Sequence, residues 1–303
     1  MTIAVFGSIN MDLVARAPRL PSAGETVAGY GFSTALGGKG ANQAVACARL
    51  GCPTRLVGRV GSDDFGTRLV ESLFSAGVES TYIATDPSQP SGVALIALDD
   101  RGENTIIVVP GANSMVGAAD LARLEQALDG ANMLLLQLEV PLSPLITAAE
   151  MAHQRGIVVM LDPAPAKSLP PALYMLADVL TPNESEAAVL VGFSLDTNAD
   201  IELAASMLLD RGARAVVIKL GGRGAYAGIS EGGRFWPPFL VEAIDTVGAG
   251  DAFNGGMAVA LAEGLPFDTA VRWGLAAGAF SVTRPGTQSA MPTRAELLAM
   301  LAR

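Results

Sequence analysis

Short apolar runs rich in β-branched residues recur along the chain, and helical patterns lie between most of them. This alternation is typical of an α/β fold in which helices cover both faces of a parallel sheet. The predicted strands are Ile3–Phe6, Leu56–Val60, Met133–Gln137, Ile157–Leu161 and Ala215–Leu220. The predicted helices are Gly40–Leu50, Phe65–Ala76, Pro141–Arg155, Ile201–Arg211, Ala252–Glu263 and Phe267–Val282. Glycine follows four of these helices, at Gly51, Gly77, Gly156 and Gly212, as expected where a helix ends in a left-handed residue.

Two segments break the alternation. Met11–Leu36 is rich in proline and glycine, and Val93–Val109 has the pattern of two strands joined by the polar turn Asp99–Glu103. Because both segments are extended, we expect them to pair outside the main sheet as a small β-sheet lid. We find no internal repeat, low-complexity tract or linker, so residues 1–303 are expected to form one α/β domain whose lid comes from about residues 11–36 and 93–109.

Composition excludes several classes of function. The 303 residues carry 20 Lys plus Arg against 30 Asp plus Glu, a formal charge of −10, which argues against a nucleic-acid partner and against binding to an anionic membrane. The chain contains no run of about 18 apolar residues, which is the length needed to span a bilayer. With two cysteines and no secretion signal, the chain is expected to be a soluble, cytoplasmic protein.

The stretch Asp245–Gly256, with the sequence DTVGAGDAFNGG, carries the strongest chemical signal. Small residues at 248–250 allow backbone N–H groups to gather at the start of the following helix, where anions such as phosphate bind. Asp251 follows at once. A carboxylate repels phosphate but suits a base that takes the proton of an attacking hydroxyl. The alternative is that Asp251 only caps the helix.

A second glycine-rich turn, Gly37–Ala44, also leads into a helix and carries Lys39 and Asn42, which suit hydrogen bonds to a polyol. It is not a Walker loop, because Gly40 rather than Ser or Thr follows the lysine. The first strand also lacks the GxGxxG of a dinucleotide site, which disfavours a dehydrogenase. The alternative is a tight turn whose glycines only permit close packing.

Together these segments resemble the two signatures of the ribokinase-like, or PfkB, family of sugar kinases. The first signature runs from Gly37–Asn42 through Gly51 to Gly61, and the second covers Asp245–Ala258. Further matching blocks follow in the family's order at Gly7–Asp12, Pro21–Thr26, Pro110–Asn113, Gln137–Glu139, Pro163–Ala166 and Thr181–Glu186. The resemblance therefore spans nearly the whole chain. It implies a three-layer α/β/α sandwich with a mostly parallel central sheet and a small β-sheet lid.

The resemblance also implies an activity, the ATP-dependent phosphorylation of D-ribose at its 5-hydroxyl to give ribose 5-phosphate and ADP. Asp251 matches the family's general base. The amides of Gly248, Ala249 and Gly250 would stabilise charge on the transferring phosphate. The sugar hydroxyls would be bound by Asn10, Asp12, Gly38, Lys39, Asn42 and Glu139. For Asn10 and Asp12, an Asx turn at the end of a strand is the alternative.

For ATP, the resemblance assigns Asn183 and Glu186 to the magnesium and phosphate end. Contact through water is expected there, because Mg²⁺ keeps several bound waters. The same spacing is also that of a helix capping box. The remaining nucleotide positions are Lys219, Gly221, Gly222, Gly224, Gly250 and Leu275. A glycine turn such as 221–224 is by itself only a hairpin.

Members of the family also bind a potassium-like cation, largely through backbone carbonyl groups. The matching positions are Asp245, Val247, Ser281, Arg284, Gly286 and Ala290. The family commonly has Ser where this chain has Ala290, which puts that ligand in doubt, although Ser289 is adjacent.

Three departures from the family pattern bear on specificity. Lys219 stands where Thr is frequent, Asp162 where Asn is frequent, and Leu275 where a polar residue is frequent. They are either neutral or mark altered nucleotide contacts or another sugar. A kinase for 2-deoxyribose, a hexose or a nucleoside, and a sugar sensor without catalysis, therefore remain alternatives. The lid sheets of two family members often pair, so a homodimer is expected.

Overall fold

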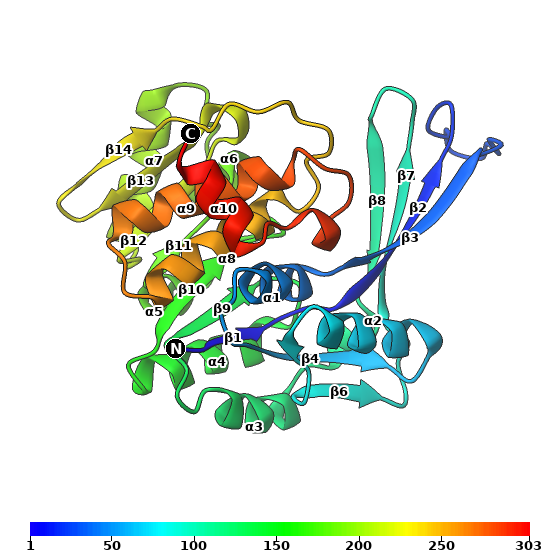
Figure 1. Ribbon diagram of the computed structural model, residues 1–303, viewed down its shortest axis with the longest axis horizontal. Helices are drawn as coiled ribbons and strands as arrows, with labels where there is room; N and C mark the ends of the chain where they lie inside the picture. The colour runs from blue at the N-terminus through cyan, green and yellow to red at the C-terminus, as the bar shows by residue number, and fades with distance from the viewer.

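The computed structural model describes residues 1–303 and contains a central sheet of ten strands (Figure 1). The strand pairings are parallel except at one edge, where β12, β13 and β14 form an antiparallel meander. The order across the sheet is β14 (Gly232–Trp236), β13 (Ala225–Ile229), β12 (Ala215–Lys219), β11 (Val179–Leu180), β10 (Val158–Asp162), β9 (Met133–Gln137), β1 (Ile3–Phe6), β4 (Thr54–Gly61) and β5 (Val78–Glu79), with β6 (Ile83–Asp86) also paired to β4. The predicted, mostly parallel sheet is confirmed.

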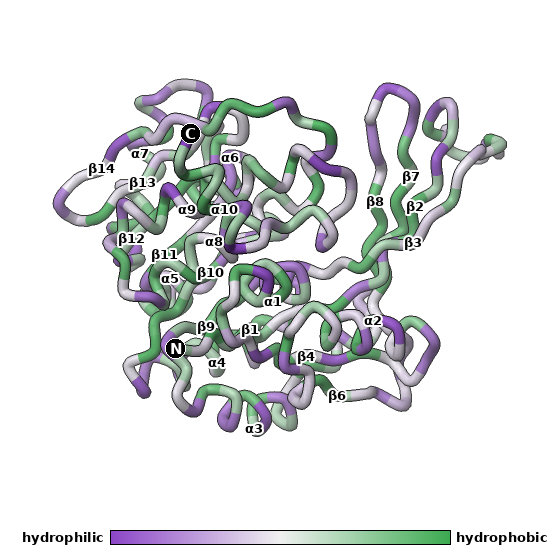
Figure 2. The backbone as a smooth tube through the Cα atoms, viewed as in Figure 1, coloured by the Kyte–Doolittle hydropathy of each residue, from purple (hydrophilic) through white to green (hydrophobic).

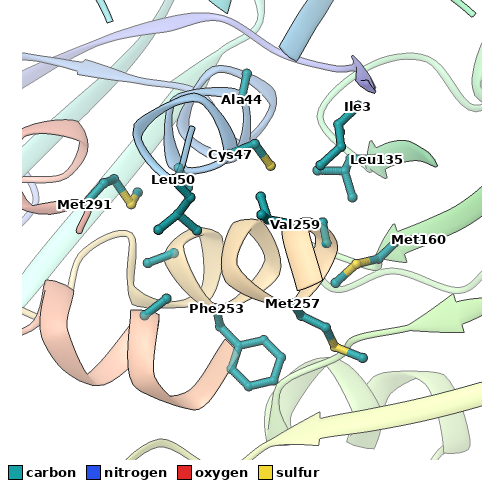
Figure 3. Close-up of a cluster of buried hydrophobic side chains, with 14 of the residues drawn as sticks. Ile3, Ala44, Cys47, Leu50, Leu135, Met160, Phe253, Met257, Val259 and Met291 are labelled. Atoms are coloured by element: carbon teal, nitrogen blue, oxygen red, sulfur yellow. The ribbon is translucent and has the colours of Figure 1, made fainter. Parts of the chain in front are cut away.

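Successive side chains of the central strands enter two separate cores. In β1, Ile3 and Val5 belong to one core, whereas Ala4 and Phe6 belong to the other. Strands buried on both faces are apolar at consecutive positions, which explains the short continuous apolar runs in the sequence. Figure 3 shows the first of these cores, in which side chains of the sheet meet those of two helices.

Helices cover both faces of the sheet, which confirms the predicted three-layer sandwich (Figure 1). One layer consists of α1 (Lys39–Arg49), α2 (Asp64–Ser75), α8 (Ala249–Ala262), α9 (Phe267–Ser281) and α10 (Arg294–Leu301). The other consists of α3 (Ala118–Ala127), α4 (Leu142–Gln154), α5 (Pro171–Leu176), α6 (Glu184–Val191) and α7 (Asn198–Asp210). Short 3₁₀ turns lie at Gly111–Met115, Gly221–Arg223 and Gln288–Ala290. None of the helices combines the length and the apolar character needed to cross a membrane.

A second, four-stranded sheet stands away from the sandwich (Figure 1). Its order is β3 (Gly31–Gly37), β2 (Asn10–Arg16), β7 (Gly92–Leu98) and β8 (Asn104–Val109). Strands β2 and β7 pair in parallel, from Asn10 with Gly92 to Arg16 with Leu98, so the expected pairing of the two irregular segments is confirmed. Residues 17–30 connect β2 to β3 without a helix or strand. Figure 2 shows apolar stretches along β7 and β8, although every residue of β8 is exposed.

The predicted helix ends are more accurate than the predicted starts. Gly51, Gly77, Gly156 and Gly212 all have positive φ just after a helix, between 67° and 118°. Helix α8, in contrast, begins three residues before the predicted Ala252. An apolar pattern reveals only the first buried residue, whereas the first turn of a helix is often formed by polar or small residues that cap it.

Glycines allow α8 to lie close to its neighbours. A Cβ atom on Gly255 would overlap that of Ala46 in α1. A Cβ on Gly256 would lie only 2.8 Å from the Cβ of Ala277 and from the carbonyl oxygen of Trp273, both in α9. The distance between α1 and α8 therefore depends on the absence of a side chain at Gly255.

Replacing Gly255 with alanine is expected to lower the free energy of unfolding by about 2 kcal/mol, because α1 and α8 must separate to admit the methyl group. Urea denaturation followed by circular dichroism measures this change. Gly222→Ala is the matched control, since a Cβ there would meet nothing within 4 Å. Equal stability of the two variants would contradict the close approach of α1 and α8.

Candidate active site

The candidate site begins where β1 and β9 end side by side. After β1 the chain returns to the central sheet at β4, which is the neighbour of β1 in one direction. After β9 it returns at β10, which is the neighbour of β9 in the opposite direction. Ligands of open α/β sheets bind at such a reversal, beyond the carboxyl ends of the strands. Here the hydroxyl of Ser8 donates a hydrogen bond to the carboxylate of Glu139, which also accepts one from the backbone N–H of Lys39 at 3.0 Å.

The turn before α1 places several predicted sugar-binding residues around this point. Gly38 has φ of 87°, and a Cβ there would lie 2.7 Å from the backbone nitrogen of Asn10. Gly40 approaches the backbone of Gly7 equally closely. The glycines of this turn do permit close packing. The same packing places the backbone N–H of Lys39 within hydrogen-bonding distance of Glu139.

Asn10 and Asp12 lie on β2, the first strand of the small sheet, rather than in an Asx turn. The side-chain oxygen of Asn10 accepts a hydrogen bond of 2.7 Å from Asn113, which fixes its orientation. Burial, together with the charges of Glu139 and Asp251, raises the pKa of Asp12 to about 7. Its carboxyl group therefore lies among other acidic groups and not in open solvent.

Asp251 is buried and occupies the third position of α8. Its two carboxylate oxygens accept hydrogen bonds from Asn42 at 2.9 Å and from Gln43 at 3.1 Å. Gly248 is the N-cap residue, so the alternative that Asp251 caps the helix is wrong. Burial raises the pKa of Asp251 to about 6; the charge of Lys39 opposes this rise and that of Asp162 adds to it.

The start of α8 offers backbone donors beside Asp251. The amides of Gly248 and Gly250 donate to no acceptor in the protein, whereas the Ala249 amide donates to the Thr246 carbonyl at 3.3 Å. Gly248 can form this turn because its φ is 78°, a conformation that favours glycine. Two of the three amides expected to bind an anion are thus free, and the third is engaged in a long hydrogen bond.

A chain of buried polar groups connects Asp251 to the far side of the site. Gln43 donates to both Asp251 and Asp162, the latter at 2.9 Å. Asp162 in turn forms an ion pair of 2.9 Å with Lys219. Two further amides hold this arrangement from behind, because Gln137 donates to Gln43 at 2.7 Å and Gln288 donates to Asn42 at 3.0 Å.

Sequence reasoning did not identify Gln43, Gln137 or Gln288 as site residues. The sequence signal that could have identified Gln43 is its position next to Asn42 at the start of a helix. In the structure both side-chain amides donate to Asp251. Gln137 and Gln288 gave no comparable signal, since each contacts the site from a distant part of the chain.

All eight predicted nucleotide positions line one cavity of about 510 Å³. Its lining includes Lys39, Asn183, Glu186, Lys219, Gly221, Gly222, Gly224, Gly248, Ala249, Gly250, Asp251 and Leu275, together with Asp162. Asn10, Asp12, Gly38, Asn42 and Glu139 do not line it. Asp251 is therefore shared between this cavity and the predicted sugar-binding residues, because Asn42 reaches its carboxylate.

Asn183 and Glu186 form the capping box that starts α6, with the Glu186 carboxylate accepting the Asn183 N–H at 2.7 Å. Both residues also line the cavity. The capping role and a role toward a ligand are thus compatible. Burial raises the pKa of Glu186, while the nearby Lys219 charge opposes the rise.

Asp245 joins two of the segments assigned to a monovalent cation. Its carboxylate accepts the N–H of Val247 at 3.0 Å and that of Gly286 at 2.9 Å. The Arg284 side chain is instead paired with Glu296, leaving only its backbone for such a role. The carbonyl oxygens of Asp245, Val247, Arg284, Gly286 and Ala290 accept no protein hydrogen bond, which fits a cation held by carbonyl groups. Ser281 is the exception among the six predicted positions, since its carbonyl accepts the N–H of Arg284 at 3.4 Å.

The chain is similar to known proteins over nearly its whole length. A model of the pfkB family of carbohydrate kinases matches residues 2–294. The ribokinase of Haemophilus influenzae is 41% identical over 300 residues, covering 99% of this chain and 98% of the relative. The deoxyribokinase of Salmonella typhi is 37% identical over 294 residues, covering 97% and 96%. The structure of Arabidopsis thaliana ribokinase complexed with ribose and ATP has a TM-score of 0.92 at 33% identity, covering 99% and 98%. The chain therefore belongs to the pfkB family of carbohydrate kinases.

Proposed function

We propose that the protein is a ribokinase, which transfers the γ-phosphoryl group of ATP to the 5-hydroxyl of D-ribose. The observation that carries this proposal is the buried carboxylate of Asp251 beside the free amides of Gly248 and Gly250. A binding protein needs no base next to an anion site. The similarity to the Haemophilus influenzae and Arabidopsis thaliana ribokinases supports ribose as the substrate.

In this proposal the nucleotide occupies the 510 Å³ cavity and the sugar lies on the other side of Asp251, against Asn10, Asp12 and Asn42, while Lys39 lines the cavity and faces both ligands. Asp251 accepts the proton of the attacking hydroxyl, whose oxygen forms a bond to the γ-phosphorus. The bond from that phosphorus to the bridging oxygen breaks, and its electron pair stays on ADP. The Gly248 and Gly250 amides stabilise the charge on the transferring group.

Two cations complete the proposed site. The carboxylate and amide oxygens of Glu186 and Asn183 are the kind of ligand that Mg²⁺ prefers, and Mg²⁺ bound to ATP would neutralise charge on its phosphates. The free carbonyl groups near Asp245 would hold K⁺. A cation there would fix the turn that precedes Gly248 and hence the orientation of the free amides.

We further propose that the small sheet acts as a lid over the sugar and that two copies pair through it. Closure would exclude water and so limit hydrolysis of ATP. Strand β8 is an edge strand, and Ile106, Ile107 and Val108 are all exposed on it. An apolar edge of this kind is stabilised by pairing with a second chain.

The proposed activity is tested by measuring ADP release from Mg-ATP with ribose, 2-deoxyribose, fructose and several nucleosides. Ribose should give the highest kcat/KM, and K⁺ should raise the rate relative to a large inert cation. Asp251→Asn, which keeps the size of the side chain but removes its charge and one acceptor, should reduce kcat by about a thousandfold. A higher kcat/KM with 2-deoxyribose would favour the activity named for the Salmonella typhi relative. No ADP release with any of them would support a sugar sensor.

The pH dependence of kcat/KM should show an acidic limb near pH 6. Asp251 accepts a proton only when ionised, and its pKa is raised to about 6, so activity is lost as the pH falls through that value. Because the charge of Lys39 lowers this pKa, Lys39→Met should move the limb to higher pH. A rate that stays constant down to pH 4.5 would exclude Asp251 as the base.

The pairing of lids predicts that Ile107→Glu converts a dimer to a monomer, because a charge would be buried in the apolar edge. Light scattering coupled to size-exclusion chromatography measures the mass. Leu203→Glu is the matched control, since Leu203 is also exposed but lies on α7, which packs against β12 and β13 of the central sheet. A monomeric native protein would refute the proposal, as would an unchanged mass of the Ile107→Glu variant.

A further inference from the structure

The ion pair between Lys219 and Asp162 has no role in the function described so far. Its side chains are only 12% and 4% exposed, respectively, and the ammonium nitrogen lies 2.9 Å from the carboxylate oxygen. A buried ion pair contributes little to stability compared with apolar residues of the same size. A pair that is both buried and part of a cavity wall therefore points to a function.

The two residues carry opposite charges, which cancel within the buried pair. They lie at the carboxyl ends of β12 and β10, on either side of β11. The fold thus brings both charges to the edge of the sheet at which the cavity opens, in direct contact with each other.

The position of the ammonium group relates it to phosphoryl transfer. The Lys219 nitrogen lies 3.5 Å from the point where a Cβ of Gly250 would stand. Gly250 offers one of the free amides of α8, and the next residue is Asp251. An ammonium group has three donors, of which Asp162 uses one. Two donors remain available to an anion beside the Gly250 amide.

The charges around the cavity also require such a cation. Asp162, Glu186 and Asp251 contribute three carboxylates, against the ammonium groups of Lys39 and Lys219. An incoming phosphoryl group adds further negative charge. Without Lys219, the excess of carboxylates over ammonium groups that the phosphoryl group faces would rise from one to two.

We infer that Lys219 is a catalytic residue that donates hydrogen bonds to the transferring γ-phosphoryl group, and that Asp162 is the residue that positions it. Lys219 transfers no proton; it stabilises charge while the phosphorus passes from ADP to the sugar oxygen. Asp162 has a second contact, since its other oxygen accepts from the same Gln43 nitrogen that holds Asp251. It thereby fixes the cation and the base relative to each other. This inference rests on the proposed kinase function.

The kinetic test uses Lys219→Met, Lys219→Arg, Lys219→Thr and the double variant Lys219→Thr/Asp162→Asn with ribose and Mg-ATP. Lys219→Met should lower kcat by about a hundredfold, with the KM for ATP changed less than fivefold. Lys219→Arg should recover part of this loss. The double variant, which removes both charges, should unfold at the wild-type temperature but remain as slow as Lys219→Thr alone. Arg214→Met is the matched control, since Arg214 pairs with Asp178 at the opposite end of β12 and should leave kcat unchanged.

Two kinetic outcomes would overturn the inference. One is a kcat of the double variant near that of the wild type, which would mean that Lys219 and Asp162 only neutralise each other's charge and have no role in catalysis. The other is a Lys219→Met variant in which only the KM for ATP changes, which would make Lys219 a residue of ground-state nucleotide binding.

A binding measurement tests Lys219 without turnover. Calorimetry with Mg²⁺ and a non-hydrolysable ATP analogue should show about threefold weaker binding to Lys219→Met, in line with the small change expected in KM, whereas ADP should bind as it does to the wild type. Equal weakening for both nucleotides would refute contact with the γ-phosphoryl group. If the wild-type chain phosphorylates none of the sugars, the proposed function fails, and this comparison still decides whether Lys219 contacts the γ-phosphoryl group.

Discussion

The site depends on a carboxylate that is withdrawn from water and held by side-chain amides. Removing the ionised form of Asp251 from solvent is costly unless hydrogen bonds replace those to water, and Asn42 and Gln43 supply them. Both amides come from α1, whereas the carboxylate comes from α8. These bonds form only if the two helices approach closely, which the glycine at 255 permits. The close approach of α1 and α8 at Gly255 thus determines how Asn42 and Gln43 hold the Asp251 carboxylate.

The same carboxylate separates two compartments built by different parts of the chain. The nucleotide side is made from the ends of β10, β11 and β12 and from the start of α8, all of which belong to the rigid sandwich. The sugar side includes Asn10 and Asp12, which lie on the first strand of the small sheet. Since β1 leads into β2 through only Gly7, Ser8 and Ile9, any movement of that sheet carries sugar-binding groups with it. In the proposed function, movement of the lid and binding of the sugar are therefore coupled, because Asn10 and Asp12 move with β2.

Much of this arrangement could be predicted from the sequence because it is local. The apolar runs predicted the sheet, the glycines predicted the helix ends, and the segment 245–256 predicted a base next to an anion site. The polar chain from Asp251 through Gln43 to Asp162 and Lys219 could not be predicted in this way. Its members come from α1, β10, β12 and α8, and only the order of strands in the sheet brings them together. The start of α8 was misplaced for a different reason, because its first turn has small residues rather than apolar ones.

The distribution of lysine has a consequence for the chemical reactivity of the protein. The sequence contains three lysines, at 39, 167 and 219, and all three are half-buried; its other strongly basic residues are arginines. Lys39 and Lys219 line the cavity, and Lys167 donates to the carbonyl oxygen of Leu138, next to Glu139. Side-chain primary amines are thus concentrated around the site, while the exposed surface carries guanidinium groups. An acylating reagent selective for amines would accordingly find no fully exposed lysine on the surface, and the neighbouring carboxylates keep Lys39 and Lys219 in the protonated form that such a reagent does not attack.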